Sequence, residues 1–220
     1  MSTLVRFSQR RLTELFGARA ARLYGIGIAA SFGVMIAVLP RPVSIGALEG
    51  LLLQALRSAS WFVAGLCAFS AARDLARRDF EEGVTALVAQ RGHDARSLEL
   101  SRGLAAAQFI ALWIGVPSSI LALIAWIKTA DPARWAWTAG WLGFVIVYSS
   151  LLGIVVAGLA RAASRLSPHR GRSLLAAFVF VPELLRTAWP SVPSVPAVFA
   201  WALDRAAELD SLTLGWSARG

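Results

Sequence analysis

Charged residues are scarce in this 220-residue chain, at 16% against 57% hydrophobic residues. A soluble domain keeps about a quarter of its residues charged, so the composition excludes an ordinary water-soluble domain. Lysine and cysteine are almost absent, with one of each, Lys128 and Cys67. A single cysteine excludes an intrachain disulfide. The two histidines show no metal-ligand spacing to each other or to Cys67, so no metal site is expected.

The chain is built instead from five apolar stretches separated by short, arginine-rich connections. Mean hydropathy is +0.61, and each stretch approaches the roughly 20 residues that a helix needs to cross a bilayer. We therefore expect an all-α fold, a polytopic membrane helical bundle of about five spans. The expected spans are 23–39, 51–72, 104–127, 135–159 and 173–189. Small residues within spans one and four fit either close helix packing or ordinary contacts within the bundle: Gly25, Gly27, Ala29, Gly33, Gly153, Ala157 and Gly158.

The two ends of the chain differ from the bundle, and they divide it into three parts. Residues 1–22 alternate basic and apolar positions at helical spacing, which is typical of an amphipathic helix in the membrane interface. Residues 23–189 form the expected transmembrane bundle, with a cytoplasmic coupling segment at 73–102. Residues 190–220 begin with three closely spaced prolines, Pro190, Pro193 and Pro196, and end in a polar tail. We expect a re-entrant or interfacial segment there.

The arginines predict the orientation. With the amino terminus in the cytoplasm, 15 of the 22 basic residues lie on the cytoplasmic side, as the positive-inside rule requires. The expected location is the bacterial inner (cytoplasmic) membrane. The net charge of +9 would indicate nucleic acid in a soluble protein, but these arginines flank apolar stretches. Anionic lipid headgroups are therefore the expected partner, and nucleic acid is not.

Most of the polar content lies in the connection 73–102, after span two. Four apolar residues recur there at the spacing of one helical face, flanked by acidic residues and a glycine. We predict a short amphipathic helix at 80–89 that binds a partner protein. The partner-binding residues are Asp79, Phe80, Glu82, Gly83, Val84, Leu87 and Val88.

The stretch from Glu81 to Gln90, followed by Arg96 and by residues 98–102 leading into a span, resembles the second cytoplasmic connection of ABC-type exporter permeases. The family often has a proline at Gly92-His93 and Gly-Lys at Ser101-Arg102. Its members start with an interfacial helix and have a proline-containing fifth span followed by a re-entrant hairpin, which residues 178–201 are similar to. They usually close with a sixth span, which this sequence does not show.

The resemblance implies a permease that pairs with a second permease subunit, as a homo- or heterodimer, on separate ATP-binding cassette subunits. The helix at 80–89 would then be the ATPase-coupling helix. The sequence has no phosphate-binding loop of the Gly-x-x-x-x-Gly-Lys-Ser/Thr type. We therefore expect no cofactor in this chain, with ATP bound and hydrolysed by the partner subunit.

Arg57 and Glu183 are the charges closest to the expected hydrocarbon region. Intramembrane charges mark substrate paths by default, but both residues also lie within reach of the outer boundary, where they would act as anchors. The spans contain no paired acids or Ser/His pair for catalysis. Two functions stay open: the permease subunit of an ABC-type exporter, or a non-transporting integral membrane subunit that anchors or assembles a larger complex.

Overall fold

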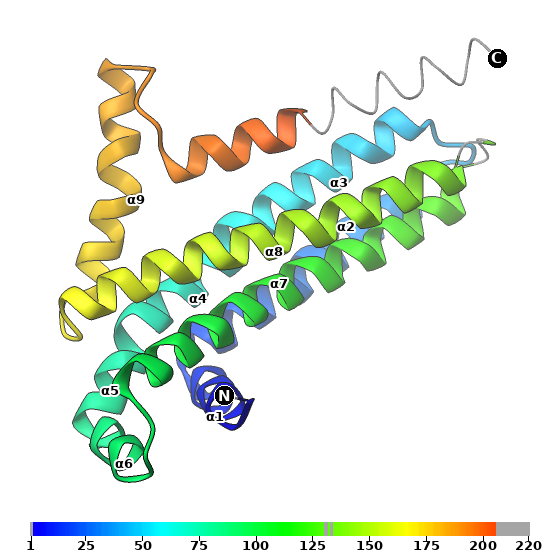
Figure 1. Ribbon diagram of the computed structural model, residues 1–220. Coiled ribbons are helices and arrows are strands. Elements are labelled where there is room, and N and C mark those ends of the chain that lie inside the picture. Colours follow the sequence, from blue (N-terminus) through cyan, green and yellow to red (C-terminus); the bar gives the residue numbers. More distant parts are fainter. Residues whose placement is uncertain (1, 130–131, 133, 206–220) are drawn as a thin grey trace.

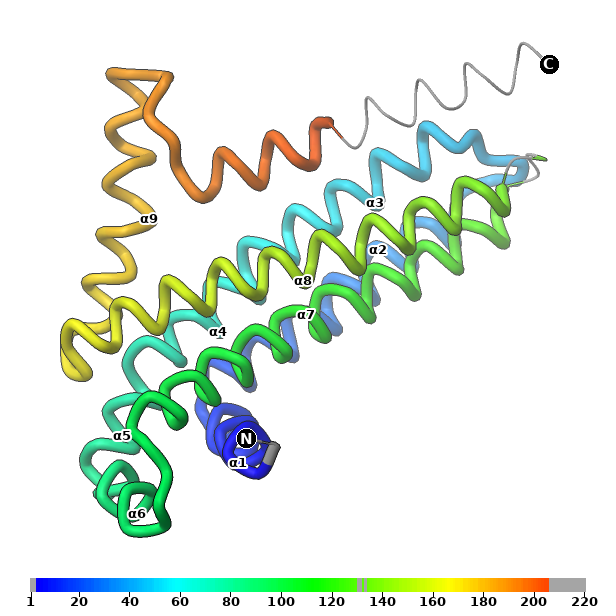
Figure 2. Tube along the Cα trace, in the orientation of Figure 1, coloured from blue at the N-terminus to red at the C-terminus, as the bar shows by residue number. Residues whose placement is uncertain are grey.

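The computed structural model describes residues 2–129, 132 and 134–205, and in these residues it contains helices and turns but no strand (Figures 1 and 2). The predicted all-α fold class is confirmed. The elements are α1 (Ser2–Glu14), α2 (Phe16–Val38), α3 (Ile45–Ala59), the π-helical η1 (Ser60–Ala64), α4 (Gly65–Phe69), the π-helical η2 (Ser70–Leu75), α5 (Ala76–Glu81), α6 (Val84–Gln90), α7 (Ala95–Lys128), α8 (Arg134–Leu166) and α9 (Gly171–Ala188). Residues 195–205 form a further helix.

Four helices are long and apolar enough to cross a membrane: α2 with 23 residues, the continuous helix Ile45–Glu81 with 37, α7 with 34 and α8 with 33. In Figure 1 they run side by side as one bundle. Each exceeds the roughly 20 residues that a span requires. The chain is therefore a multi-pass helical membrane protein.

The helix ends differ from the predicted boundaries. The first long helix begins at Phe16, not at residue 23, because extended backbone at Leu15 (φ −72°, ψ 142°) separates it from α1. Span two continues past residue 72 to Glu81, and α7 already begins at Ala95. The predicted connection 73–102 thus consists largely of the ends of two long helices. Hydropathy shows where the side chains become polar. A helix does not end there, because its backbone hydrogen bonds continue through polar residues.

The amino-terminal helix α1 lies across the end of the bundle, seen almost end-on in Figure 1. Its inward face buries Leu12 and Ser8, and the Ser8 hydroxyl lies 3.1 Å from that of Ser101 on α7. The predicted amphipathic helix therefore exists over Ser2–Glu14 rather than over 1–22. Its placement in the membrane interface stays a prediction.

Helices α7 and α8 make the most extensive helix–helix contact in the described residues, and it includes a close approach of their backbones. A Cβ atom at Gly153 would lie 2.6 Å from the carbonyl oxygen of Ala107, so only glycine permits this approach. Gly158, five residues further along α8, has no atom within 4 Å of such a Cβ. Close helix packing therefore applies to Gly153 and not to Gly158, since the two residues lie on different faces of α8.

The predicted fifth span forms α9, which is not among the four long apolar helices. It leaves the end of the bundle at a steep angle (Figure 1). Gly171, its first residue, packs directly against the backbone carbonyl of Ala72. After the turn at 189–194, residues 195–205 run back towards α8 and α3. The predicted segment 190–220 is described as far as residue 205, and its relation to the membrane stays a prediction.

Candidate functional site

The predicted coupling helix is interrupted in the structure. Glycine 83 adopts a left-handed conformation (φ 65°, ψ 20°) and separates α5 from α6, a conformation that L side chains rarely take. Phe80 therefore belongs to the end of span two, while Val84, Leu87 and Val88 belong to α6. The prediction of one continuous helix over 80–89 was wrong. We call residues 76–90 the elbow.

Asp79 is the anchor of the elbow. Its side chain is only 1% exposed and lies between two arginines from other helices. Arg102 Nε on α7 donates a hydrogen bond to Asp79 Oδ2 at 2.8 Å. Arg11 Nε on α1 lies 2.7 Å from Oδ1, an ion pair that is not aligned as a hydrogen bond. One buried carboxylate thus joins α1, α5 and α7.

Glu82 extends this cluster at the turn. Its carboxylate lies 2.8 Å from Arg11 Nη1 and 2.8 Å from Arg78 Nε. Hydrogen bonds from Arg11, and secondarily from Arg78, lower the pKa of Glu82 below its ordinary value of 4.5. Arg78 also pairs with Glu14 on α1 at 2.9 Å. The acidic residues of the elbow are therefore engaged within the chain.

The apolar residues of the elbow divide into two groups. Val84 and Val88 are buried against Leu98, with Leu4 of α1 packed beside them. Phe80 and Leu87 remain 61% and 54% exposed. The structure thus separates the predicted partner-binding residues into those that hold the elbow on the bundle and two large apolar side chains that face outward.

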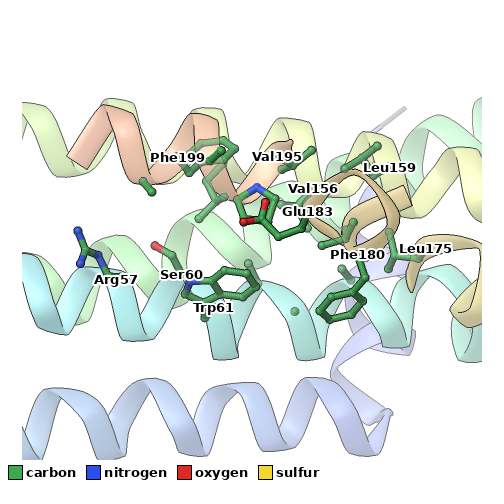
Figure 3. Close-up of a pocket in the computed structure, with 18 of the residues that line it drawn as sticks. Arg57, Ser60, Trp61, Val156, Leu159, Leu175, Phe180, Glu183, Val195 and Phe199 are labelled. Atoms are coloured by element: carbon green, nitrogen blue, oxygen red, sulfur yellow. The ribbon is translucent and has the colours of Figure 1, made fainter. Parts of the chain in front are cut away.

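The other two predicted residues, Arg57 and Glu183, line the same pocket (Figure 3). Its volume is about 350 Å³. Span two forms one side, from Arg57 through η1 to Phe69, and α8 contributes Tyr148 and Leu152. α9 and the helix 195–205 close the other sides. We call the helix 195–205 the covering helix.

Three contacts hold the covering helix over the pocket. Arg57 Nη2 lies 3.0 Å from Asp204 Oδ1, and Ser194, just before the helix, donates a hydrogen bond to Glu183. The ring of Phe199 stands edge-on to Tyr148, with centroids 5.7 Å apart. Glu183 also pairs with Arg186 at 3.5 Å, as its spacing in the sequence suggests.

Sequence reasoning missed four residues that complete these sites. Arg11 and Arg102 carry the countercharge of Asp79, and the hydroxyls of Ser60 and Tyr148, 2.9 Å apart, line the pocket. Ser60 and Tyr148 were detectable from the sequence, as hydroxyl side chains within apolar spans. The arginines were not, since 21 of the 22 basic residues are arginine and nothing local distinguishes these two.

The described residues contain no group of three or more His, Cys, Asp or Glu side chains positioned to hold a metal ion. Comparison with known protein families, with curated proteins and with solved structures finds no match to this chain. The case for a function therefore depends on the elbow and the pocket themselves.

Proposed function

We propose that this chain is the membrane-spanning subunit of an ATP-driven ABC-type exporter, and that its elbow binds a separate ATP-binding cassette subunit. The observation that carries the proposal is the pair of exposed apolar side chains, Phe80 and Leu87, at the charged end of the bundle. Large apolar groups in a charged surface mark protein contact sites. A partner with an apolar groove would cover both.

The charges around the pair favour a protein over the membrane as its partner. Acidic residues are mixed with the arginines of the elbow, and an anionic lipid surface would repel them. The turn at Glu82 and Gly83 puts Phe80 and Leu87 on successive helices, and both side chains are exposed.

The connections of the elbow support a coupling role. α5 is the last part of the continuous helix Ile45–Glu81, so a displacement of the elbow acts directly on span two. Through Asp79 the elbow is also tied to α1 and α7. Two π-helical segments, η1 and η2, interrupt span two between the elbow and Arg57. Such segments mark places where a helix adjusts its winding.

The remaining parts of the proposal follow from the sequence. The arginine distribution supports an orientation with the amino terminus and the elbow on the cytoplasmic side, where ATP is available. The membrane in this proposal is the bacterial inner membrane. A second permease subunit completes the transporter, and ATP binds only to the partner ATPase. Residues 178–201 form the hairpin of α9 and the covering helix, a layout that agrees with the family resemblance.

The test is recovery of the partner. The tagged chain is purified in mild detergent, and proteins bound to it are identified by mass spectrometry and assayed for ATP hydrolysis. We expect a phosphate-loop ATPase with the unaltered chain and its loss with Phe80→Asp/Leu87→Asp. Trp189→Asp is the matched control, since Trp189 is 62% exposed and lies beyond the far end of α9.

Two results would contradict the proposal. If no ATPase accompanies the unaltered chain, the exporter assignment fails. If the ATPase accompanies Phe80→Asp/Leu87→Asp as well, the elbow is not the contact. Recovery of other membrane subunits alone would favour the second candidate, a non-transporting assembly subunit. One observation favours that candidate: α9 leaves the end of the bundle at a steep angle and exposes apolar residues outside the pocket, such as Val181 and Leu184.

A further inference from the structure

We propose that the pocket beneath the covering helix binds one hydrocarbon chain of an anionic lipid, with the lipid's head group at Arg57. This inference adds the chemical class of the ligand to the pocket. The view that this lipid is the exported cargo rests on the proposed function, whereas the binding of the lipid does not. Three features of the pocket support this ligand: its lining, its length and its charged end.

The lining suits a hydrocarbon chain. A volume of about 350 Å³ lies within the roughly 300–1,000 Å³ of ligand-binding pockets. The end away from Arg57 is apolar, formed by Leu159, Leu175 and Phe180 (Figure 3). Gly65 adds open space, because a Cβ atom there would meet no atom within 4 Å. An apolar pocket in a membrane protein is surrounded by lipid chains. A chain can enter it from the bilayer without being exposed to water.

The length of the pocket matches a single leaflet. Its wall on span two runs from Arg57 to Phe69 along one continuous helix. Twelve residues at the helical rise correspond to about 18 Å. The hydrocarbon core of a bilayer is about 30 Å thick, so one leaflet measures about 15 Å. A chain of ordinary length therefore fills the pocket from its charged end to its apolar end.

The charged end favours an anion. Arg186, the other arginine that lines the pocket, is paired with Glu183, which also accepts a hydrogen bond from Ser194, so Arg57 is the cation that an entering head group meets. Arg57 is paired with Asp204, and their side chains are 47% and 66% exposed. Such exposed pairs are worth at most about 1 kcal/mol. A carboxylate or phosphate head group can replace Asp204, since guanidinium binds both in the same bidentate manner.

The test uses a palmitic acid that carries a photoactivatable diazirine on its chain, added to the full-length chain in detergent. Labelled peptides are mapped by mass spectrometry. We expect labelling on the residues that line the pocket, and its loss in Gly65→Leu, whose side chain fills the space. Gly158→Leu is the matched control: it makes the same change at an open, exposed position of α8 outside the pocket.

A second pair of variants tests the head group and does not depend on how Gly65→Leu folds. Arg57→Gln removes the cation and should weaken labelling, while Asp204→Asn frees Arg57 and should strengthen it. Each change should be up to about fivefold, the equivalent of one exposed ion pair. The corresponding diazirine alcohol has no charge and should respond to neither variant.

Equal labelling of the unaltered chain and Gly65→Leu would overturn the pocket as the site. Equal responses of the acid and the alcohol to the charge variants would overturn the role of Arg57. The ATPase-recovery experiment distinguishes the two proposals. If the ATPase binds but the pocket takes no label, only the lipid inference fails. If the pocket is labelled without any ATPase, the exporter proposal fails and the lipid site stands.

Discussion

Replacing Asp79 by asparagine should destabilise the protein more than any other single change in the elbow. The side chain is 1% exposed, and its two arginine partners, Arg11 and Arg102, are 12% and 16% exposed. Asparagine keeps the volume but removes the charge, so the largely buried guanidinium of Arg102 loses its Asp79 counterion and that of Arg11 keeps only Glu82. Breaking a buried ion pair by removing one partner costs about 3–5 kcal/mol.

That cost converts into a shift in melting temperature. For a chain of this size each kcal/mol lowers Tm by about 2–4 °C, so Asp79→Asn should lower it by about 6–20 °C. The matched control is Glu81→Gln, two residues away. Glu81 is 49% exposed and pairs with Arg77 one turn back, an exposed pair worth about 0.3–0.5 kcal/mol. Its Tm should change by less than about 2 °C.

The chain contains its own reporter for this measurement. Cys67 is the single cysteine and is 0% exposed in the centre of the bundle. A maleimide dye that fluoresces on reaction with a thiol therefore reports unfolding during a temperature ramp in detergent. Asp79→Asn/Arg102→Gln should recover part of the lost stability, because it removes the buried cation that Asp79 neutralises. A Tm for Asp79→Asn within 2 °C of Glu81→Gln would refute the reasoning.

Two further predictions use the same dye assay. Gly153→Ala should lower Tm, because its Cβ would lie 2.6 Å from the carbonyl oxygen of Ala107. Gly158→Ala is the control and should leave Tm unchanged or raise it through helix propensity. Equal effects of the two changes on Tm would contradict the close contact of α7 and α8. Glu82 has a lowered pKa in the folded state, so its stabilising contribution is complete above its ordinary pKa of 4.5 and disappears as the pH falls through the lower folded-state value. Glu82→Gln should therefore be less stable than the unaltered chain at neutral pH, with the gap closing in acid; a gap that widens in acid would reverse the assigned sign.

Much of the fold was predictable because bilayers impose simple rules on sequence. A long apolar stretch in lipid must satisfy its own backbone hydrogen bonds, which a helix does, so the all-α bundle followed from composition and length. Four of the five expected spans lie in the four long apolar helices, and the fifth does not. The helix ends did not follow. Residues 16–22 and 73–81 are polar enough to leave the hydrocarbon, yet they continue the helices of their neighbours. Hydropathy measures solvation, and helix length depends on the backbone.

The candidate sites were predictable in part. Asp79, Phe80, Leu87, Arg57 and Glu183 stood out by charge or by spacing, and each now lies at the elbow or in the pocket. Their different roles did not stand out. In the sequence Asp79 and Phe80 are adjacent members of one pattern, but the structure buries the first in an ion pair and leaves the second exposed.

The sequence by itself determined the membrane class, the all-helical fold and the charged end of the molecule, because these depend on composition and on contacts within a few residues. Only the tertiary structure decided which arginines neutralise Asp79, which of two similar glycines lets α7 meet α8, and that Arg57 and Glu183, far apart in the chain, share one pocket. These are contacts between helices distant in sequence. They depend on the relative rotation of the helices about their axes, which arises from the packing of the whole bundle and leaves no local pattern.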